Sequence, residues 1–125
     1  GELPALQAFR AALEAGAPSG QVTFSSDAGG SLPLYRDGEL VGLTIAEPAS
    51  LLELFHAASS GEQLPPAEVL AALTCNPADA LNLPRKGRIT VGSDADLLLL
   101  DPAEAQLSDV FCLGRRLLRH GRIEF

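Results

Sequence analysis

Basic residues are scarce in this sequence of 125 residues. It contains nine Lys and Arg against sixteen Asp and Glu, which gives a formal net charge of −7. Binding along a nucleic acid backbone requires clustered Lys and Arg, so we expect no nucleic acid partner. Two local basic clusters, 85–88 and 115–122, lie among turn residues and are interpreted as solvated hairpin ends.

Long apolar runs are also missing. No run approaches the roughly 20 residues of a membrane span, and residues 1–4 have neither the basic region nor the apolar core of a signal peptide. We therefore expect no membrane partner and a cytoplasmic location. Only two cysteines occur, Cys75 and Cys112, and they lie inside apolar segments, which predicts buried thiols without a disulfide. Methionine is absent, which favours an internal or C-terminal piece of a longer chain.

The composition is otherwise that of a soluble globular protein, and its periodicity changes near Pro84. Before this point, apolar spacing predicts helices over 3–15, 48–59, 67–73 and 76–82, one buried strand over 21–25, and a hairpin turning at Asp37-Gly38. Asn76 is expected to cap the fourth helix. After it, short strands are predicted over 88–90, 95–100, 110–113, 116–119 and 122–125, with tight turns at Gly114-Arg115 and His120-Gly121.

Asp27 is the leading candidate for chemistry. It follows the predicted strand over 21–25 and precedes a glycine-rich loop, which is how α/β enzymes present a reactive group. It could act as a metal ligand or general base, although the local composition favours a plain turn or cap carboxylate. Ser31 could bind an anion through its hydroxyl, helped by the backbone N–H groups of Gly29 and Gly30, or could be a surface residue of the loop.

The other reactive side chains do not complete a site. His56, in a predicted helix, and His120, in a predicted turn, have no second ligand at metal-binding spacing and are interpreted as structural or exposed. Lys86 is the single lysine and lies in a turn, so we do not assign it as a catalytic amine. A serine nucleophile is not indicated, since no Gly-x-Ser-x-Gly elbow is present.

Two stretches resemble the C-terminal signature of the metal-dependent amidohydrolases. The first is TCNPADALNL over 74–83, and the second is KGRITVGSDADLLLLD over 86–101. Within that superfamily the stretch SSDAGGS over 25–31 is most similar to isoaspartyl dipeptidases, with Ala28 in place of the usual glycine. The resemblance extends over nearly the whole chain.

The resemblance implies an α/β fold made of parts of two domains. Residues 1–84 would form the C-terminal segment of a (β/α)8 barrel, with its last strand and terminal helices. Residues 85–125 would supply the C-terminal strands of a small β-sandwich. Such a barrel needs about 250 residues, so most of it would lie outside this chain. We expect the intact enzyme to be a homo-oligomer.

The resemblance also implies metal-dependent hydrolysis of β-aspartyl (isoaspartyl) dipeptides by the intact enzyme. Asp27 would be catalytic and would ligate one of two divalent metal ions, expected to be zinc. Ser31 would hold the α-carboxylate of the dipeptide substrate, with Gly29 and Gly30 as further substrate-binding residues. The family's other metal ligands match nothing here, so we expect these 125 residues alone to be inactive and not to hold the metals. The alternatives are another amidohydrolase, of dihydroorotase, hydantoinase or aminoacylase type, and a non-catalytic assembly fragment.

Overall fold

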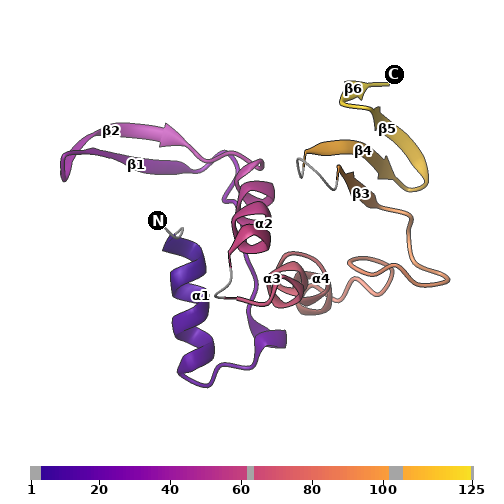
Figure 1. The fold of residues 1–125 in the computed structure, drawn as a ribbon, viewed down its shortest axis with the longest axis horizontal. Coiled ribbons are helices and arrows are strands. Elements are labelled where there is room, and N and C mark those ends of the chain that lie inside the picture. Colours follow the sequence, from indigo (N-terminus) through magenta and orange to yellow (C-terminus); the bar gives the residue numbers. More distant parts are fainter. Residues whose placement is uncertain (1–3, 62–63, 102–105, 125) are drawn as a thin grey trace. The chain divides into compact units, whose positions relative to one another are not determined.

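The computed structural model describes residues 4–61, 64–101 and 106–124, which form an α/β chain (Figure 1). Two compact units, residues 1–73 and 74–125, are described separately. The first contains α1 (Pro4–Glu14), the 3₁₀ turn η1 (Ser19–Gln21), β1 (Ser31–Arg36), β2 (Glu39–Ile45), α2 (Ser50–Ser60) and α3 (Pro66–Leu73). The second contains α4 (Cys75–Ala80), β3 (Leu97–Leu100), β4 (Leu107–Cys112), β5 (Arg115–Arg119) and β6 (Arg122–Ile123).

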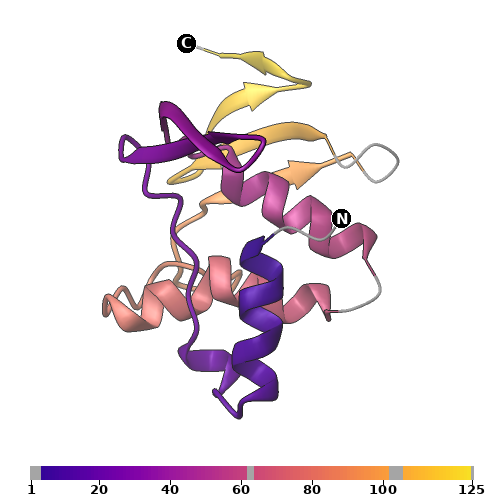
Figure 2. The same cartoon turned by 90° about the vertical axis from the view of Figure 1, so that its left-hand side faces the viewer.

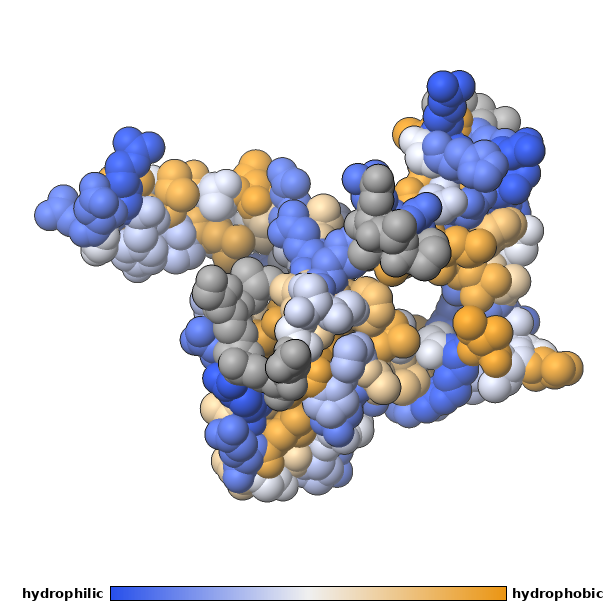
Figure 3. Space-filling model, in the orientation of Figure 1, coloured by the Kyte–Doolittle hydropathy of each residue, from blue (hydrophilic) through white to orange (hydrophobic). Residues whose placement is uncertain are grey.

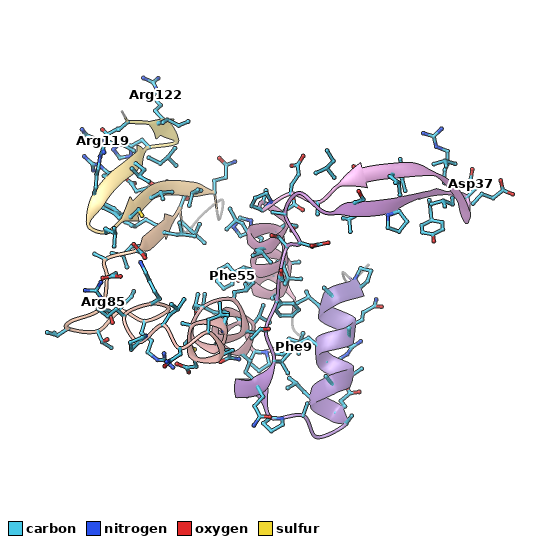
Figure 4. The ribbon with its side chains drawn as sticks, turned by 180° about the vertical axis from the view of Figure 1, so that it is seen from behind. Phe9, Asp37, Phe55, Arg85, Arg119 and Arg122 are labelled. Atoms are coloured by element: carbon cyan, nitrogen blue, oxygen red, sulfur yellow. The ribbon has the colours of Figure 1, made fainter. Side chains whose placement is uncertain are left out.

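Three helices enclose the apolar core of the first unit, as their apolar spacing predicts. Its buried residues are Leu6 and Phe9 of α1, Leu54 and Ala58 of α2, Leu64, and Val69 and Ala72 of α3. Phe9 lies inside this unit (Figure 4) and stacks on Phe24 at a tilt, with ring centroids 5.2 Å apart. Phe55 of α2 is only half-buried.

The prediction of a strand over 21–25 is wrong, because these residues form no strand in the structure. Residues 22–26 alternate between half-buried and exposed side chains, as a strand would, but no strand pairs with them among the described residues. A strand exists only through hydrogen bonds to a neighbour. Here Phe24 instead donates its backbone N–H to the carbonyl of Ala72 at 3.0 Å, so the segment leading to Asp27 is anchored on α3.

The predicted hairpin is confirmed. β1 and β2 pair antiparallel around Asp37-Gly38, whose φ angles of 52° and 85° are those of a type I′ turn. One residue is inserted in β2 beyond the pair of Leu34 with Gly42. Figure 2 shows the resulting two-stranded ribbon with a strong twist.

The helix α4 begins one residue before the predicted start, at Cys75, so Asn76 is not its cap and is buried instead. Its C-terminal end is closed by two hydrogen bonds, from Leu83 N–H to Ala78 O at 2.8 Å and from Asn82 N–H to Asp79 O at 3.0 Å. Asn82 has φ of 54°. This is the Schellman arrangement, in which Asn is a tolerated left-handed residue.

The second unit contains a four-stranded antiparallel sheet in the order β3-β4-β5-β6. The last four predicted strands are confirmed, while 88–90 form no strand. The turn His120-Gly121 is confirmed, with φ of 46° and 73°. The other turn is centred on Leu113-Gly114, with φ of 51° and 80°, and not on Gly114-Arg115, because the glycine takes the second left-handed position.

Ion pairs connect the residues around α4 with those that follow it. Arg88 donates two hydrogen bonds to the Asp79 carboxylate, at 2.8 and 2.6 Å, and this contact lowers the pKa of Asp79. Lys86 pairs with Asp94 at 3.0 Å and with Asp96. The hydrogen bond to Asp96, and then that to Asp94, raises the pKa of Lys86. The cluster at 85–88 is therefore solvent-exposed, as predicted, but its cations are ion-paired and it is not the end of a hairpin, because 88–90 form no strand.

These contacts explain why the compact units divide between Leu73 and Thr74, ahead of the predicted boundary near Pro84. Gly87 approaches the Thr74 backbone so closely that a Cβ at residue 87 would lie 2.5 Å from the Thr74 carbonyl oxygen. The assignment of residues 1–84 to a barrel and 85–125 to a sandwich stays a prediction.

Both cysteines are unbridged, as predicted, but only one of them is shielded from solvent. Cys75 is half-buried, whereas Cys112 at the end of β4 is exposed. Its thiol forms a hydrogen bond to Asp96 that helps to lower the pKa of that carboxyl, after the larger effects of Lys86 and the Leu113 N–H. None of the helices in the described ranges has the length and apolar character that crossing a bilayer would require.

Candidate active-site loop

Asp27 begins a tight turn that leads directly into β1. Its carbonyl accepts the N–H of Gly30 at 2.7 Å, and Gly29 has φ of 85° while Ala28 keeps a negative φ. These are the features of a type II turn, which requires glycine at its third position only. Alanine at residue 28, where the resembling family has glycine, is therefore compatible with the loop.

The carboxylate of Asp27 lies over Gly30. A Cβ placed on residue 30 would come within 2.2 Å of Asp27 Oδ2 and 2.8 Å of Asp27 O. Asp27 itself has φ of 50°, a left-handed conformation that Asp tolerates better than most residues, and its backbone N–H donates to Ser25 Oγ at 3.3 Å. The missing side chain at residue 30 thus makes room for an exposed carboxylate in a defined turn.

Two backbone hydrogen bonds attach this turn to the base of the hairpin. Gly29 donates its N–H to Ala46 O at 3.0 Å, and Ala46 donates to Gly30 O at 2.9 Å. Ala46 is buried. The expectation that Gly29 and Gly30 offer N–H groups to an anion is wrong, because both groups already donate to backbone carbonyls, of Ala46 and Asp27 respectively. Any part that these glycines play in substrate binding must come from the space they leave.

Ser31 is the first residue of β1 and is exposed. Its partner across the hairpin is Ile45, the residue before the anchoring Ala46. The turn brings Asp27 and Ser31 into one continuous loop, with the carboxylate at its start and the hydroxyl at its end. Residues 22–35 contain no Lys or Arg, so the charge of an anion bound at Ser31 would be balanced by residues elsewhere.

The donor set does not fit a complete metal centre. Two divalent ions need several His, Cys, Asp or Glu ligands, and no three such side chains gather anywhere in residues 4–61, 64–101 and 106–124. The exposed carboxylate of Asp27 suits one ligand position and no more. His56 lies on α2, and its buried Nε2 has no hydrogen-bond partner among the described residues. His120 lies in the β5–β6 turn.

The role of Gly30 was not visible in the sequence, although the Gly-Gly pair was. Two adjacent glycines in a loop signal either left-handed backbone or close approach. The structure assigns one reason to each glycine, since Gly29 has the positive φ while Gly30 has the close contact with Asp27. The two hydrogen bonds between Ala46 and the turn could not be predicted from the sequence, because they join backbone groups alone.

Most of the chain matches one known protein family. The family model described as "Amidohydrolase family" matches residues 4–117, so the chain belongs to the amidohydrolase family. The prediction made from the two C-terminal signature stretches is thereby confirmed.

Individual relatives are found among solved structures. The chain is similar to a β-aspartyl dipeptidase of Fervidobacterium islandicum AW-1 in complex with a β-Asp-Leu dipeptide, with a TM-score of 0.81 and 35% identity over 97% of this chain and 32% of the other. A second structure of β-aspartyl dipeptidase from that organism gives a TM-score of 0.78 and 29% identity, covering 100% and 30%. The chain thus spans about a third of the length of these structures. A dihydroorotase of Halobacterium salinarum is 47% identical over 53 residues, which are 42% of this chain and 12% of the relative.

Proposed function

We propose that the protein to which these 125 residues belong hydrolyses β-aspartyl dipeptides. The observation that carries the proposal is the loop from Asp27 to Ser31, which presents a carboxylate and a hydroxyl from one turn. Its support comes from the amidohydrolase family match and from the likeness to two β-aspartyl dipeptidase structures. The assignment of residues 1–84 to the C-terminal segment of a catalytic barrel belongs to the same proposal.

In this proposal Asp27 has two tasks. Its carboxylate supplies one ligand to a pair of divalent metal ions, zinc in our prediction, whose other ligands lie outside these residues. It also accepts the proton of the attacking water and delivers it to the departing amine. General acid–base transfer by a positioned carboxylate contributes about 10² to 10⁴ in rate. The close contact with Gly30 defines where this carboxylate is held.

Ser31 binds the substrate carboxylate in the same proposal. Its exposed hydroxyl donates a hydrogen bond to the α-carboxylate of the residue that is released. Gly29 provides the left-handed turn and Gly30 the space, so both shape the substrate-binding loop without donating to the ligand. Homo-oligomeric assembly and a cytoplasmic location stay predictions.

Replacing the carboxylate by an amide tests this role. Asp27→Asn in the full-length protein keeps the size of the side chain and is expected to reduce kcat for β-Asp-Leu by about 10² to 10⁴. Asp37→Asn, at the tip of the same hairpin (Figure 4), is the matched control and should leave kcat unchanged. Near-normal turnover by Asp27→Asn would refute the catalytic assignment.

A dihydroorotase-type activity is the second candidate, favoured by the local similarity to a dihydroorotase. A panel containing β-Asp-Leu, dihydroorotate, a hydantoin and an N-acyl amino acid separates these reactions on the full-length protein. Hydrolysis of the β-aspartyl dipeptide alone supports the first proposal. Turnover of a cyclic amide without dipeptide hydrolysis would replace it by the second.

A further inference from the structure

The β1–β2 hairpin exposes an unusual amount of apolar side chain for a surface element. Leu43 and Ile45 are each 69% exposed, and Tyr35 and Leu40 are 62% and 61% exposed. Figure 3 shows apolar residues over this projecting ribbon of the first unit. Exposed apolar patches on soluble proteins commonly mark binding surfaces, and this one begins at Ser31.

The register of the hairpin places part of this patch beside Ser31. Ser31 lies opposite Ile45, and Pro33 lies opposite Leu43. Opposite residues in an antiparallel pair have Cβ atoms about 5 Å apart on one face, and alternate residues share that face. The irregularity of the ladder lies beyond these pairs. Ser31, Pro33, Leu43 and Ile45 therefore form one surface, which we call the serine face.

We infer that the serine face binds the side chain of the amino acid released from the dipeptide, and that Ile45 and Leu43 select apolar residues at this position. The inference rests on the proposed function, in which Ser31 holds the α-carboxylate of that amino acid. The carboxylate and the side chain branch from the same carbon atom. Ser31 and Ile45 lie opposite each other, with Cβ atoms expected about 5 Å apart, so a carboxylate held by the Ser31 hydroxyl brings the side chain on the next carbon atom beside Ile45.

The chemistry of this surface favours one class of substrate. Its side chains next to Ser31 are aliphatic and offer no partner to a charged or amide side chain, which would lose hydration on contact. An apolar side chain gains from the same contact, by about fourfold in affinity for each buried methylene group. β-Aspartyl dipeptides ending in Leu should therefore react faster than those ending in Gly or Glu.

The test compares substrates within each variant of the full-length protein. Ile45→Thr retains a β-branched side chain suited to a strand and is expected to lower the ratio of kcat/KM for β-Asp-Leu over β-Asp-Gly by about threefold to tenfold. Leu34→Thr lies on the opposite face of β1 and should change this ratio by less than about twofold. Ile45→Lys should raise kcat/KM for β-Asp-Glu relative to β-Asp-Leu, an outcome that misfolding does not produce.

Two results would overturn the inference in distinguishable ways. If both dipeptides are hydrolysed but the ratios stay unchanged in Ile45→Thr and Ile45→Lys, or change equally in Leu34→Thr, the serine face does not bind the released residue and the proposed function stands. If the unaltered protein hydrolyses none of these dipeptides, the proposed function fails and the inference fails with it.

Discussion

A single methyl group at residue 30 would disturb the Asp27 carboxylate directly. The Cβ of Gly30→Ala would lie 2.2 Å from Asp27 Oδ2 and 2.8 Å from Asp27 O, where non-bonded atoms prefer about 3.5 Å. The carboxylate can rotate away, but the carbonyl oxygen is fixed by the 2.7 Å hydrogen bond from the N–H of residue 30. Both the reactive group and the turn that carries it must therefore move.

The size of the effect follows from that displacement. Relieving the backbone overlap requires a shift approaching 1 Å, and a misplacement of about 1 Å at a reacting group costs about 10² in rate. We expect kcat/KM for β-Asp-Leu to fall about hundredfold in the full-length protein. The stability cost should stay near 1 kcal/mol, because the loop is exposed and can relax.

Gly42→Ala provides the matched control for this experiment. Residue 42 lies in β2 of the same hairpin, and a Cβ there would meet nothing within 4 Å. Activity and melting temperature are measured together for both variants. Loss of activity in Gly30→Ala with a retained melting temperature supports the role of Gly30. Activity equal to that of Gly42→Ala would show that the contact with Asp27 does not matter.

Two further predictions concern Ser31 and Lys86. Ser31→Ala should raise KM for β-aspartyl dipeptides by about tenfold or more, the cost of a hydrogen bond to a charged group, with a smaller change in kcat; an unchanged KM in steady-state kinetics contradicts the carboxylate role. The ion pairs of Lys86 raise its pKa in the folded state. The stability that they contribute is fully present below the pKa of Lys in the unfolded chain, about 10.4. It is lost as the pH rises through the higher pKa of the folded state. Lys86→Gln should therefore have a lower melting temperature than the unaltered protein at pH 7, and its melting temperature should fall less above pH 10. Melting temperatures of the two proteins that change in parallel with pH would contradict this.

The helices and hairpins could be predicted because their signals are local. The spacing of Leu6 and Phe9 and the Asp37-Gly38 pair each act within a few residues, and the structure follows them. The strand over 21–25 could not be judged in this way. Its alternating pattern is present, but a strand also requires a partner, which a single segment cannot supply.

The polar contacts were harder to predict than the apolar ones. The Asp79 carboxylate binds Arg88, which lies nine positions later in the sequence. Cys112 was expected to be buried in an apolar strand, yet it is exposed at the end of β4, and its thiol reaches Asp96, the residue before β3. Such pairings depend on how the chain returns to itself, and no periodicity records them.

The position of the candidate loop could be predicted from the sequence, but the hydrogen bonds within and around it could not. Asp27 was identified from its place between an extended segment and a glycine-rich loop, and the structure does place it in an exposed turn. The backbone N–H groups of Gly29 and Gly30 were assigned to an anion, and they donate to the carbonyls of Ala46 and Asp27 instead. Composition indicates where a chain turns, whereas the direction of each donor depends on torsion angles that composition leaves open.

The two interpretations of Asp27, a turn residue and a functional carboxylate, turn out to be compatible. Its backbone closes the turn while its carboxylate remains exposed over Gly30. The left-handed backbone does not separate the two interpretations, because Asp adopts it more readily than most residues and Asp37 has the same conformation in the hairpin turn. Neither Asp27 nor Gly30 adds to the apolar core, which lies among the helices. The proposal that Asp27 acts in chemistry therefore rests on its exposed carboxylate and on the space that Gly30 leaves for it, and not on backbone strain.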